Sequence, residues 1–179
     1  MTPGAASMPN PSVHASAVLV GNRAVLIRGP SGAGKSRLAF DLILAGRSGQ
    51  LPPSVLVGDD RVHLDTVAGE LWVRPTHELA GLIEIRGLGI RRCEFVGEAV
   101  VGLVVDLAAA DAARLPPPQA LETSLNGVKL PRIPVETGFQ SLPMVVAALT
   151  TTESSLSGNH SDDCAKGFGN HISPTIATE

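Results

Sequence analysis

The sequence predicts an α/β fold with a mixed β-sheet, and three observations support this prediction. Short apolar runs rich in β-branched residues recur along the chain and are typical of strands. A glycine-rich segment at 29–34 separates one such run from a stretch with the apolar spacing of a helix. The most continuously apolar run, AVVGLVVDL at 99–107, is typical of a central strand covered on both faces. With 179 residues, the chain is long enough for one domain with a substantial core.

Composition divides the chain into an arm, one domain and a tail. Residues 1–12 are predicted to form a flexible N-terminal arm, because they are rich in Pro, Gly, Ser and Asn. Residues 13–150 contain the apolar runs and form the predicted domain. Residues 151–179 contain few large apolar side chains and show no period, so a disordered tail is expected.

The overall charge and the cysteine content exclude several classes of protein. The formal net charge is -3, so the chain has no positive excess with which to bind nucleic acid or an anionic membrane. No basic start precedes an apolar block at the N-terminus, and no apolar run approaches the roughly 20 residues of a membrane-spanning helix. Cys93 and Cys164 lie far apart, and neither they nor the histidines have the spacing of a zinc site. We therefore expect a reduced, cytoplasmic protein without zinc.

The first half of the domain is predicted to begin with two strands and a helix. The segment SAVLVGNRAVLIRG predicts strands on either side of a Gly21–Asn22 turn, because this dipeptide accepts positive φ at low cost. The second strand is expected to end at Arg28. The segment GRSGQLPP ends the helix that starts at Lys35. Within this predicted helix the apolar residues recur at helical spacing, at Leu38, Ala39, Leu42, Ile43 and Ala45.

The second half of the domain is predicted to be mostly strands. SVLVGDD predicts a buried strand that ends in two carboxylates, and VHLDTVAGELWVRP predicts a hairpin with an Ala–Gly turn. The segment GLIEIRGLGIRR is expected to form one short strand with a glycine-rich exit. A short helix is expected over AAADAARL until the prolines at 116–118 end it. VKLPRIPV predicts a last extended segment, and SLPMVVAALTT predicts a closing helix.

Residues 29–36, GPSGAGKS, match the Gly-x-x-x-x-Gly-Lys-Ser pattern of a phosphate-binding loop. Such a loop turns its backbone N–H groups inward through conformations that side chains obstruct, which explains its glycines. The helix that follows adds the positive end of its dipole. Lys35 is expected to reach the β- and γ-phosphates of a nucleoside triphosphate, and the Ser36 hydroxyl is placed to ligate Mg²⁺. The residues expected to bind the nucleotide are Gly29, Pro30, Ser31, Gly32, Ala33, Gly34, Lys35 and Ser36.

A protein with this loop usually reaches Mg²⁺ through a carboxylate at the end of another strand, and two segments offer one. SVLVGDD ends in Asp59 and Asp60, whereas GLVVDL ends next to Asp106. We favour the pair, because adjacent carboxylates at a strand end alternate faces, so that one can ligate the metal while its neighbour faces the acceptor. Asp106 is more simply explained as a strand-end turn residue or a cap.

Along the chain, GPSGAGKS, LVGDD and LIEIRGLGI follow one another in an order that resembles the catalytic domain of the HPr kinase/phosphorylase family. The third segment is the most specific, because a generic enzyme with a phosphate-binding loop has no reason to carry Glu-Ile-Arg-Gly-x-Gly after its aspartates. The similarity covers about residues 13–135. The length and the start of the chain resemble the short alphaproteobacterial form of the family, which lacks a separate N-terminal domain.

The resemblance implies a nucleotide-binding α/β core similar to that of phosphoenolpyruvate carboxykinase. It implies a protein serine kinase that uses ATP and Mg²⁺ to phosphorylate HPr, the small phosphocarrier protein of the sugar phosphotransferase system. In many members of the family the enzyme also catalyses the reverse phosphorolysis. The resemblance further implies a homo-oligomer, which is a hexamer in the family.

The resemblance also assigns roles to residues of this chain. Asp60 is the implied general base, His14 is expected beside the reacting phosphoryl group, and Lys35 is expected to bind phosphate. Arg114 fits the place of an active-site arginine of the family loosely. The metal ligands implied by the resemblance are Ser36 and Glu84, and the pair of adjacent carboxylates adds Asp59 as a further candidate.

One segment departs from the family pattern. Where many members carry Pro-Val-Arg-Pro-Gly-Arg, this chain carries PVETGF at 134–139, so that Glu136 and Phe139 replace two arginines. A weaker phosphate site is expected, which would reduce phosphorolysis more than kinase activity. Two alternatives stay open: a nucleotide-binding sensor with little turnover, and a small-molecule kinase. The intact Asp59, Asp60 and Glu84 favour catalysis over sensing.

Overall fold

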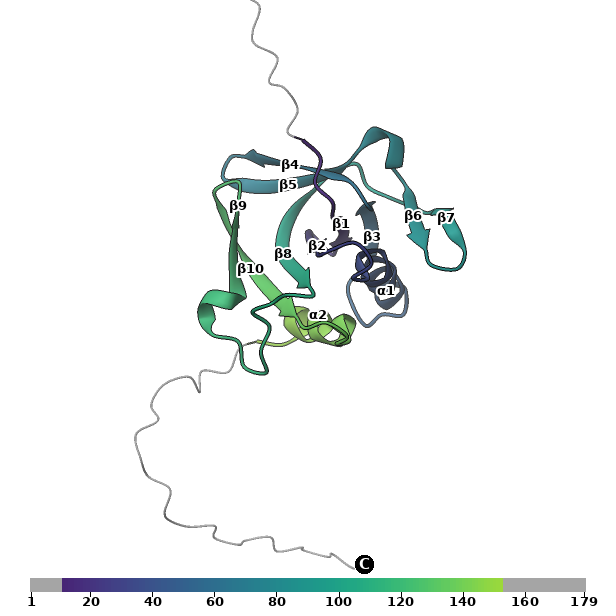
Figure 1. The fold of residues 1–179 in the computed structure, drawn as a ribbon. Coiled ribbons are helices and arrows are strands. Elements are labelled where there is room, and N and C mark those ends of the chain that lie inside the picture. Colours follow the sequence, from purple (N-terminus) through teal and green to yellow (C-terminus); the bar gives the residue numbers. More distant parts are fainter. Residues whose placement is uncertain (1–10, 153–179) are drawn as a thin grey trace, which may run out of the picture.

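A computed structural model describes residues 11–152, so the predictions for residues 1–10 of the arm and 153–179 of the tail lie outside the described residues. An eight-stranded mixed sheet forms the body, with the strand order β3-β1-β2-β8-β10-β9, and the hairpin of β4 and β5 joins it where β5 pairs with β8 (Figure 1). The helices α1 (Lys35–Arg47) and α2 (Ser141–Thr150) pack against it. The predicted α/β fold with a mixed sheet is therefore confirmed. No helix within the described range is long and apolar enough to span a bilayer.

Two strands and a tight turn open the sheet, as the sequence predicts. Strand β1 (Ser16–Val20) pairs antiparallel with β2 (Arg23–Arg28), and the register closes at Val20 and Arg23 around the Gly21–Asn22 turn. On its other edge, β1 pairs antiparallel with β3 (Ser54–Gly58). Because β1 runs against both neighbours, β2 and β3 point in the same direction.

The centre of the sheet is parallel. Strand β8 (Ala99–Leu107) pairs parallel with β2 on one side and with β10 (Val128–Val135) on the other. The carboxyl ends of β3, β2, β8 and β10 therefore lie at one edge of the sheet, which we call the carboxyl edge. In open α/β sheets ligands bind at this edge, and each segment that leaves it contributes to a common surface.

Hairpins supply the remaining strands. β4 (Val62–Val67) and β5 (Glu70–Pro75) pair around the predicted Ala68–Gly69 turn. A short 3₁₀ turn, η1 (His77–Leu79), leads to β6 (Leu82–Ile85), which pairs with β7 (Gly89–Arg92) in a separate two-stranded sheet. The sequence analysis expected a single strand here. The glycines at 87 and 89 adopt positive φ and turn the chain back, so the expected glycine-rich exit becomes a second strand.

Two apolar cores lie on opposite faces of the sheet. Figure 1 shows α1 and α2 on one side of the central strands and the β4–β5 hairpin on the other. The helix-side core contains Leu38 and Leu42 of α1 and Val145 of α2, while the hairpin-side core contains Leu71 and Val73 of β5. Burial on both faces explains why β8 is so continuously apolar, and it confirms the predicted central strand.

The segment after β8 is not the helix that the sequence analysis expected over residues 108–115. Ala108 has φ 55°, and the N–H of Ala109 donates to the carbonyl of Val135, so the chain leaves β8 tied to β10 rather than coiled on itself. The prolines at 116–118 lead into a 3₁₀ turn, η2 (Pro118–Leu121), which begins at the last of them, instead of ending a helix. Strand β9 (Glu122–Leu125), which was not predicted, then forms a hairpin with β10.

Candidate active site

The predicted phosphate-binding loop joins β2 to α1 at the carboxyl edge. Gly29 follows Arg28 directly, and a Cβ atom on Gly29 would lie 2.8 Å from the carbonyl oxygen of Leu107 in β8. Gly34, with φ 98°, is the last residue before the helix. Only glycine fits both positions, since the first is too close to a neighbouring strand and the second is left-handed. The strand, loop and helix that the motif requires are all present.

Lys35 lies at the first turn of α1, with only 6% of its surface exposed. Its Nζ donates to the carbonyl oxygens of Gly29 and Pro30, at 3.0 Å each. Burial lowers the pKa of this amine, and the charges of Asp60 and Asp59 oppose that shift. The ammonium group is thus held against the loop, and its third N–H has no partner among residues 11–152.

Asp60 occupies an unusual turn beyond the end of β3. Its φ is 64°, and the N–H of Arg61 donates to the carbonyl of Asp59 at 2.7 Å, which closes a three-residue γ-turn around Asp60. Positive φ at the centre of such a turn is rare and strained, and strain of this kind clusters at functional sites. The turn presents the Asp60 side chain to solvent, with 62% of it exposed.

His14 meets Asp60 although the two residues are far apart in sequence. The Nε2 atom of His14 lies 3.2 Å from Oδ1 of Asp60. His14 precedes β1, whose amino end lies at the carboxyl edge because β1 runs against β2 and β3. The antiparallel β1 therefore brings the predicted histidine to the predicted base.

Asp59 is buried and already bonded to the protein, in contrast to its neighbour. Its Oδ1 accepts a hydrogen bond from the Ser16 hydroxyl at 2.5 Å, and its Oδ2 accepts one from the backbone N–H of Glu84 at 3.1 Å. Only 3% of Asp59 is exposed. The residue thus links β1, β3 and β6, and its predicted role as a metal ligand stays a prediction.

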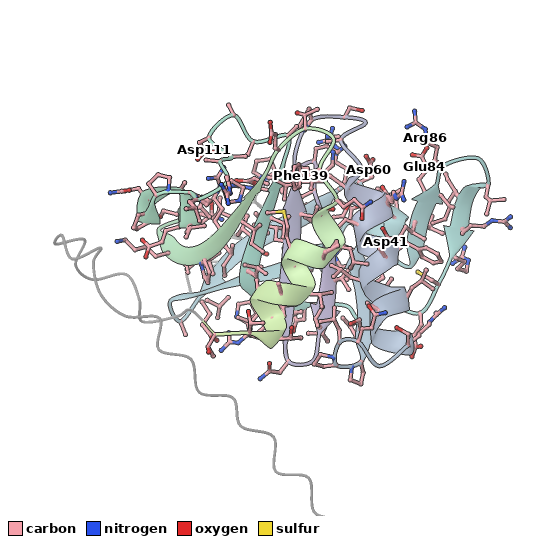
Figure 2. All side chains as sticks on the ribbon, turned by 90° about the horizontal axis from the view of Figure 1, so that it is seen from below. Asp41, Asp60, Glu84, Arg86, Asp111 and Phe139 are labelled. Carbon is pink, nitrogen blue, oxygen red and sulfur yellow. The ribbon has the colours of Figure 1, made fainter. Side chains whose placement is uncertain are left out.

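The hydrogen bond from Glu84 to Asp59 fixes β6 beside the end of β3. The Glu84 side chain is exposed, and Figure 2 shows Glu84, Arg86 and Asp60 at the same end of the molecule. Ser36, the other predicted metal ligand, is partly buried in the first turn of α1. Within residues 11–152, no group of three or more His, Cys, Asp or Glu side chains forms a ready-made metal site.

Asp106, the competing carboxylate, belongs to an ion-pair network at the end of β8. It accepts from Nε and Nη2 of Arg28 at 2.7 Å each and from Nε of Arg132 at 2.5 Å. Arg132 also donates to both carboxylate oxygens of Asp111, at 2.6 and 2.9 Å. Burial raises the pKa of Asp106, but the hydrogen bonds from Arg28 and Arg132 outweigh burial and lower it. This network was not predicted from the sequence, and it explains Asp106 without a metal.

Arg114 is not joined to these residues. It lies exposed in the segment between β8 and η2, and across the described part of the chain it forms no hydrogen bond or ion pair. The departing segment 136–139 follows β10 at the same edge and forms a turn in which the N–H of Phe139 donates to the carbonyl of Glu136. The residues that the structure brings together are therefore His14, Lys35, Asp59, Asp60 and Glu84.

The sequence is similar to known proteins of one family. The family model of the HPr serine kinase C-terminal domain matches residues 6–166. The HPr kinase/phosphorylase of Streptococcus thermophilus strain LMD-9 is 32% identical in an alignment 188 residues long. That alignment covers 93% of this chain and 55% of that protein. That of Mycoplasma mycoides subsp. mycoides is 38% identical over 82 residues, which cover 46% of this chain and 24% of that protein. The chain thus spans at most about half the length of these relatives.

A solved structure supports the fold as well as the family. The HPr(Ser) kinase/phosphatase from Coxiella burnetii superposes with a TM-score of 0.61 at 26% identity, over 77% of this chain and 92% of that one. Sequence and structure comparisons therefore point to the family that the three motifs indicated.

Proposed function

This chain belongs to the HPr serine kinase C-terminal domain family, and on that premise we propose that it transfers the γ-phosphoryl group of ATP to a serine of an HPr-like phosphocarrier protein. The observation that carries this proposal is the meeting of Lys35, Asp60 and His14 at one edge of the sheet. Lys35 acts on the phosphate donor, ATP, whereas Asp60 and His14 act on the acceptor serine.

The loop at 29–36 holds the triphosphate. Its backbone N–H groups and the start of α1 offer positive partial charge to the phosphates. Lys35 adds a full charge at the start of the helix, where its ammonium group exchanges the carbonyl oxygens of Gly29 and Pro30 for phosphate oxygens. Phosphoryl transfer depends mainly on positioning the phosphates and on neutralising their negative charge. Loss of the Lys35 amine removes its contribution to both.

The donor set fits Mg²⁺. Ser36, Glu84 and Asp59 offer hard oxygen atoms, and the hydrogen bond from Glu84 to Asp59 keeps the two carboxylate residues adjacent. Mg²⁺ is usually held by one or two carboxylates together with substrate phosphates, and Asp59 and Glu84 would supply the carboxylates here. When bound, the ion neutralises charge on the β- and γ-phosphates. Glu84, being exposed, is the ligand most easily rearranged.

Asp60 takes the proton of the acceptor serine. A serine hydroxyl is a poor nucleophile at neutral pH, and a carboxylate that accepts its proton while the new O–P bond forms and the bond to ADP breaks lowers the barrier. The exposure of Asp60 suits a serine carried by another protein. His14 holds the carboxylate in position from the β1 side.

The replacement of two arginines in segment 134–139 bears on direction. Glu136 and Phe139 cannot hold an inorganic phosphate as guanidinium groups do. We therefore propose that this protein acts mainly as a kinase, with weak phosphorolysis.

Transfer of label from [γ-³²P]ATP to purified HPr tests the proposal. Asp60→Asn is expected to abolish transfer while ATP still binds. The matched control is Asp41→Asn, which removes a carboxylate from the side of α1 and should leave transfer unchanged (Figure 2). Tight ATP binding without transfer by the unmodified protein would instead support the sensor alternative. Transfer to a small molecule but not to HPr would support the alternative of a small-molecule kinase.

A further inference from the structure

The order of the strands fixes which way a bound nucleotide points. On one side of β2, beyond β1, the end of β3 carries Asp60, and His14 lies beside it. On the other side lie the ends of β8 and then β10. Since neighbouring strands are about 4.8 Å apart, the ends of β3 and β10 lie roughly 10 Å to either side of the phosphate-binding loop. A triphosphate that lies along this edge, with its last phosphate facing Asp60, directs its nucleoside towards the ends of β8 and β10.

That second side carries a large exposed aromatic residue. Phe139 lies between β10 and α2, and 66% of it is exposed within the described range. Both helices follow parallel strands and pack together, so they begin at the same edge, and Figure 2 shows Phe139 and Asp60 at that end of the molecule. Leu115, on the segment that follows β8, is 85% exposed at the same edge.

The backbone of Phe139 is held in a turn, whereas its ring is not packed against the core. Its N–H donates to the carbonyl of Glu136 at 3.1 Å, and Gly138 has φ 83°, so the backbone of the turn is fixed. The following helix packs Leu142, Met144 and Val146 against the core, whereas the phenyl ring stays outside it. An exposed ring that is carried by a fixed turn, on the nucleoside side of a phosphate-binding loop, is a surface on which a purine base can stack.

We propose that the base of the bound nucleoside triphosphate stacks on Phe139. The inference rests on the proposed function only in requiring a nucleoside triphosphate at residues 29–36. Stacking on an aromatic ring is tolerant of base identity because every base has a π-face. The site should therefore accept ATP and GTP with similar affinity, and it should bind either more tightly than inorganic tripolyphosphate, which has no base.

The test measures the affinity of the full chain for ATP, GTP and tripolyphosphate by calorimetry, with Mg²⁺ present. Phe139→Ala is expected to weaken ATP and GTP roughly fivefold or more, as alanine substitution at base-stacking aromatics does, and to leave tripolyphosphate unchanged. Val67→Ala is the matched control, since Val67 is also an exposed apolar residue, 54% exposed, in the distant β4–β5 hairpin. Phe139→Trp is expected to retain affinity and to show tryptophan quenching by ATP but not by tripolyphosphate, above the signal from Trp72.

Three outcomes overturn the inference. If Phe139→Ala binds ATP as tightly as the unmodified protein, the ring is not part of the nucleotide site. If the variant loses equal affinity for ATP and for tripolyphosphate, the effect comes from the phosphate contacts or from the turn and not from stacking. A change in sedimentation or in HPr affinity, without a change in ATP affinity, makes the ring a contact for a second copy or for the protein substrate. If ATP binds but HPr is not phosphorylated, the proposed function fails while these variants still decide the stacking.

Discussion

Asp106→Asn tests whether the carboxylate at the end of β8 holds the sheet together or binds metal. Asp106 accepts three charge-assisted hydrogen bonds, from Arg28 and Arg132, and only 15% of its side chain is exposed. Asparagine keeps one acceptor oxygen, and its NH₂ group points hydrogen atoms at a guanidinium group. At least one bond to a charged donor, worth about 1.5–3 kcal/mol, is lost together with the charge. Because Arg28 is 29% exposed and regains some solvation, we expect a loss of about 2–3 kcal/mol in the free energy of unfolding.

Urea unfolding at pH 7, followed by the fluorescence of Trp72, measures this loss. The control is Asp111→Asn, which removes the outer partner of Arg132. Its effect should be smaller, because 52% of the Asp111 side chain is exposed and water screens the pair. The Mg²⁺ concentration that gives half-maximal transfer to HPr should not change in either variant.

The difference in stability between the unmodified protein and Asp106→Asn should also depend on pH. The pKa of Asp106 in the folded state lies below its ordinary value of 3.8. The carboxylate therefore stabilises the fold fully above that value, and its contribution is lost as the pH falls through the folded-state pKa. The stability gap between the unmodified protein and Asp106→Asn should narrow below about pH 4. Equal stability at pH 7, or a strongly raised Mg²⁺ requirement without destabilisation, would refute the structural role and point to a metal ligand.

Three further predictions follow from single positions. Lys35→Ala should remove measurable ATP binding in calorimetry while the circular dichroism spectrum is retained; unchanged affinity would contradict the loop assignment. Glu84→Ala should raise the Mg²⁺ concentration needed for transfer roughly tenfold or more, since replacing even a residue that only supports a metal ligand costs about 10–100-fold in affinity, and an unaltered Mg²⁺ titration would exclude it as a ligand. Gly46→Ala should lower the free energy of unfolding by about 1–2 kcal/mol, because the new Cβ would lie 2.7 Å from the backbone nitrogen of Ser54, whereas Gly97→Ala, in open space, should not.

Local sequence sufficed for the features that depend on neighbouring residues. The Gly21–Asn22 turn, the strand before Gly29 and the helix from Lys35 were predicted correctly, because turn preference and apolar period act over a few residues. The family motifs brought His14, Asp60 and Glu84 to attention before any fold was known. Their convergence could not come from spacing, since His14 reaches the site because β1 runs against β2 and β3, and Glu84 reaches it through the hydrogen bond from its N–H to Asp59.

Two segments differ from their predictions because of a contact or a backbone conformation that the apolar pattern does not encode. The expected helix at 108–115 has apolar residues suited to one, but the hydrogen bond from Ala109 to Val135 ties its start to β10. The second strand of the β6–β7 hairpin follows from the conformation of Gly87 and Gly89 rather than from any apolar alternation.

Short contiguous motifs were sufficient to identify the phosphate-binding loop, the pair of adjacent aspartates and the family-specific acidic strand, because each can be recognised without knowledge of the fold. The pairing of distant charged residues could be seen only in the folded chain. Asp106 and Arg28 are 78 positions apart, and they pair because parallel β8 and β2 place them in register. The same strand order puts the end of β3, which leads to Asp60, on one side of the loop and the end of β10, which leads to Phe139, on the other, since the sheet alone sets the order of segments that are far apart in sequence.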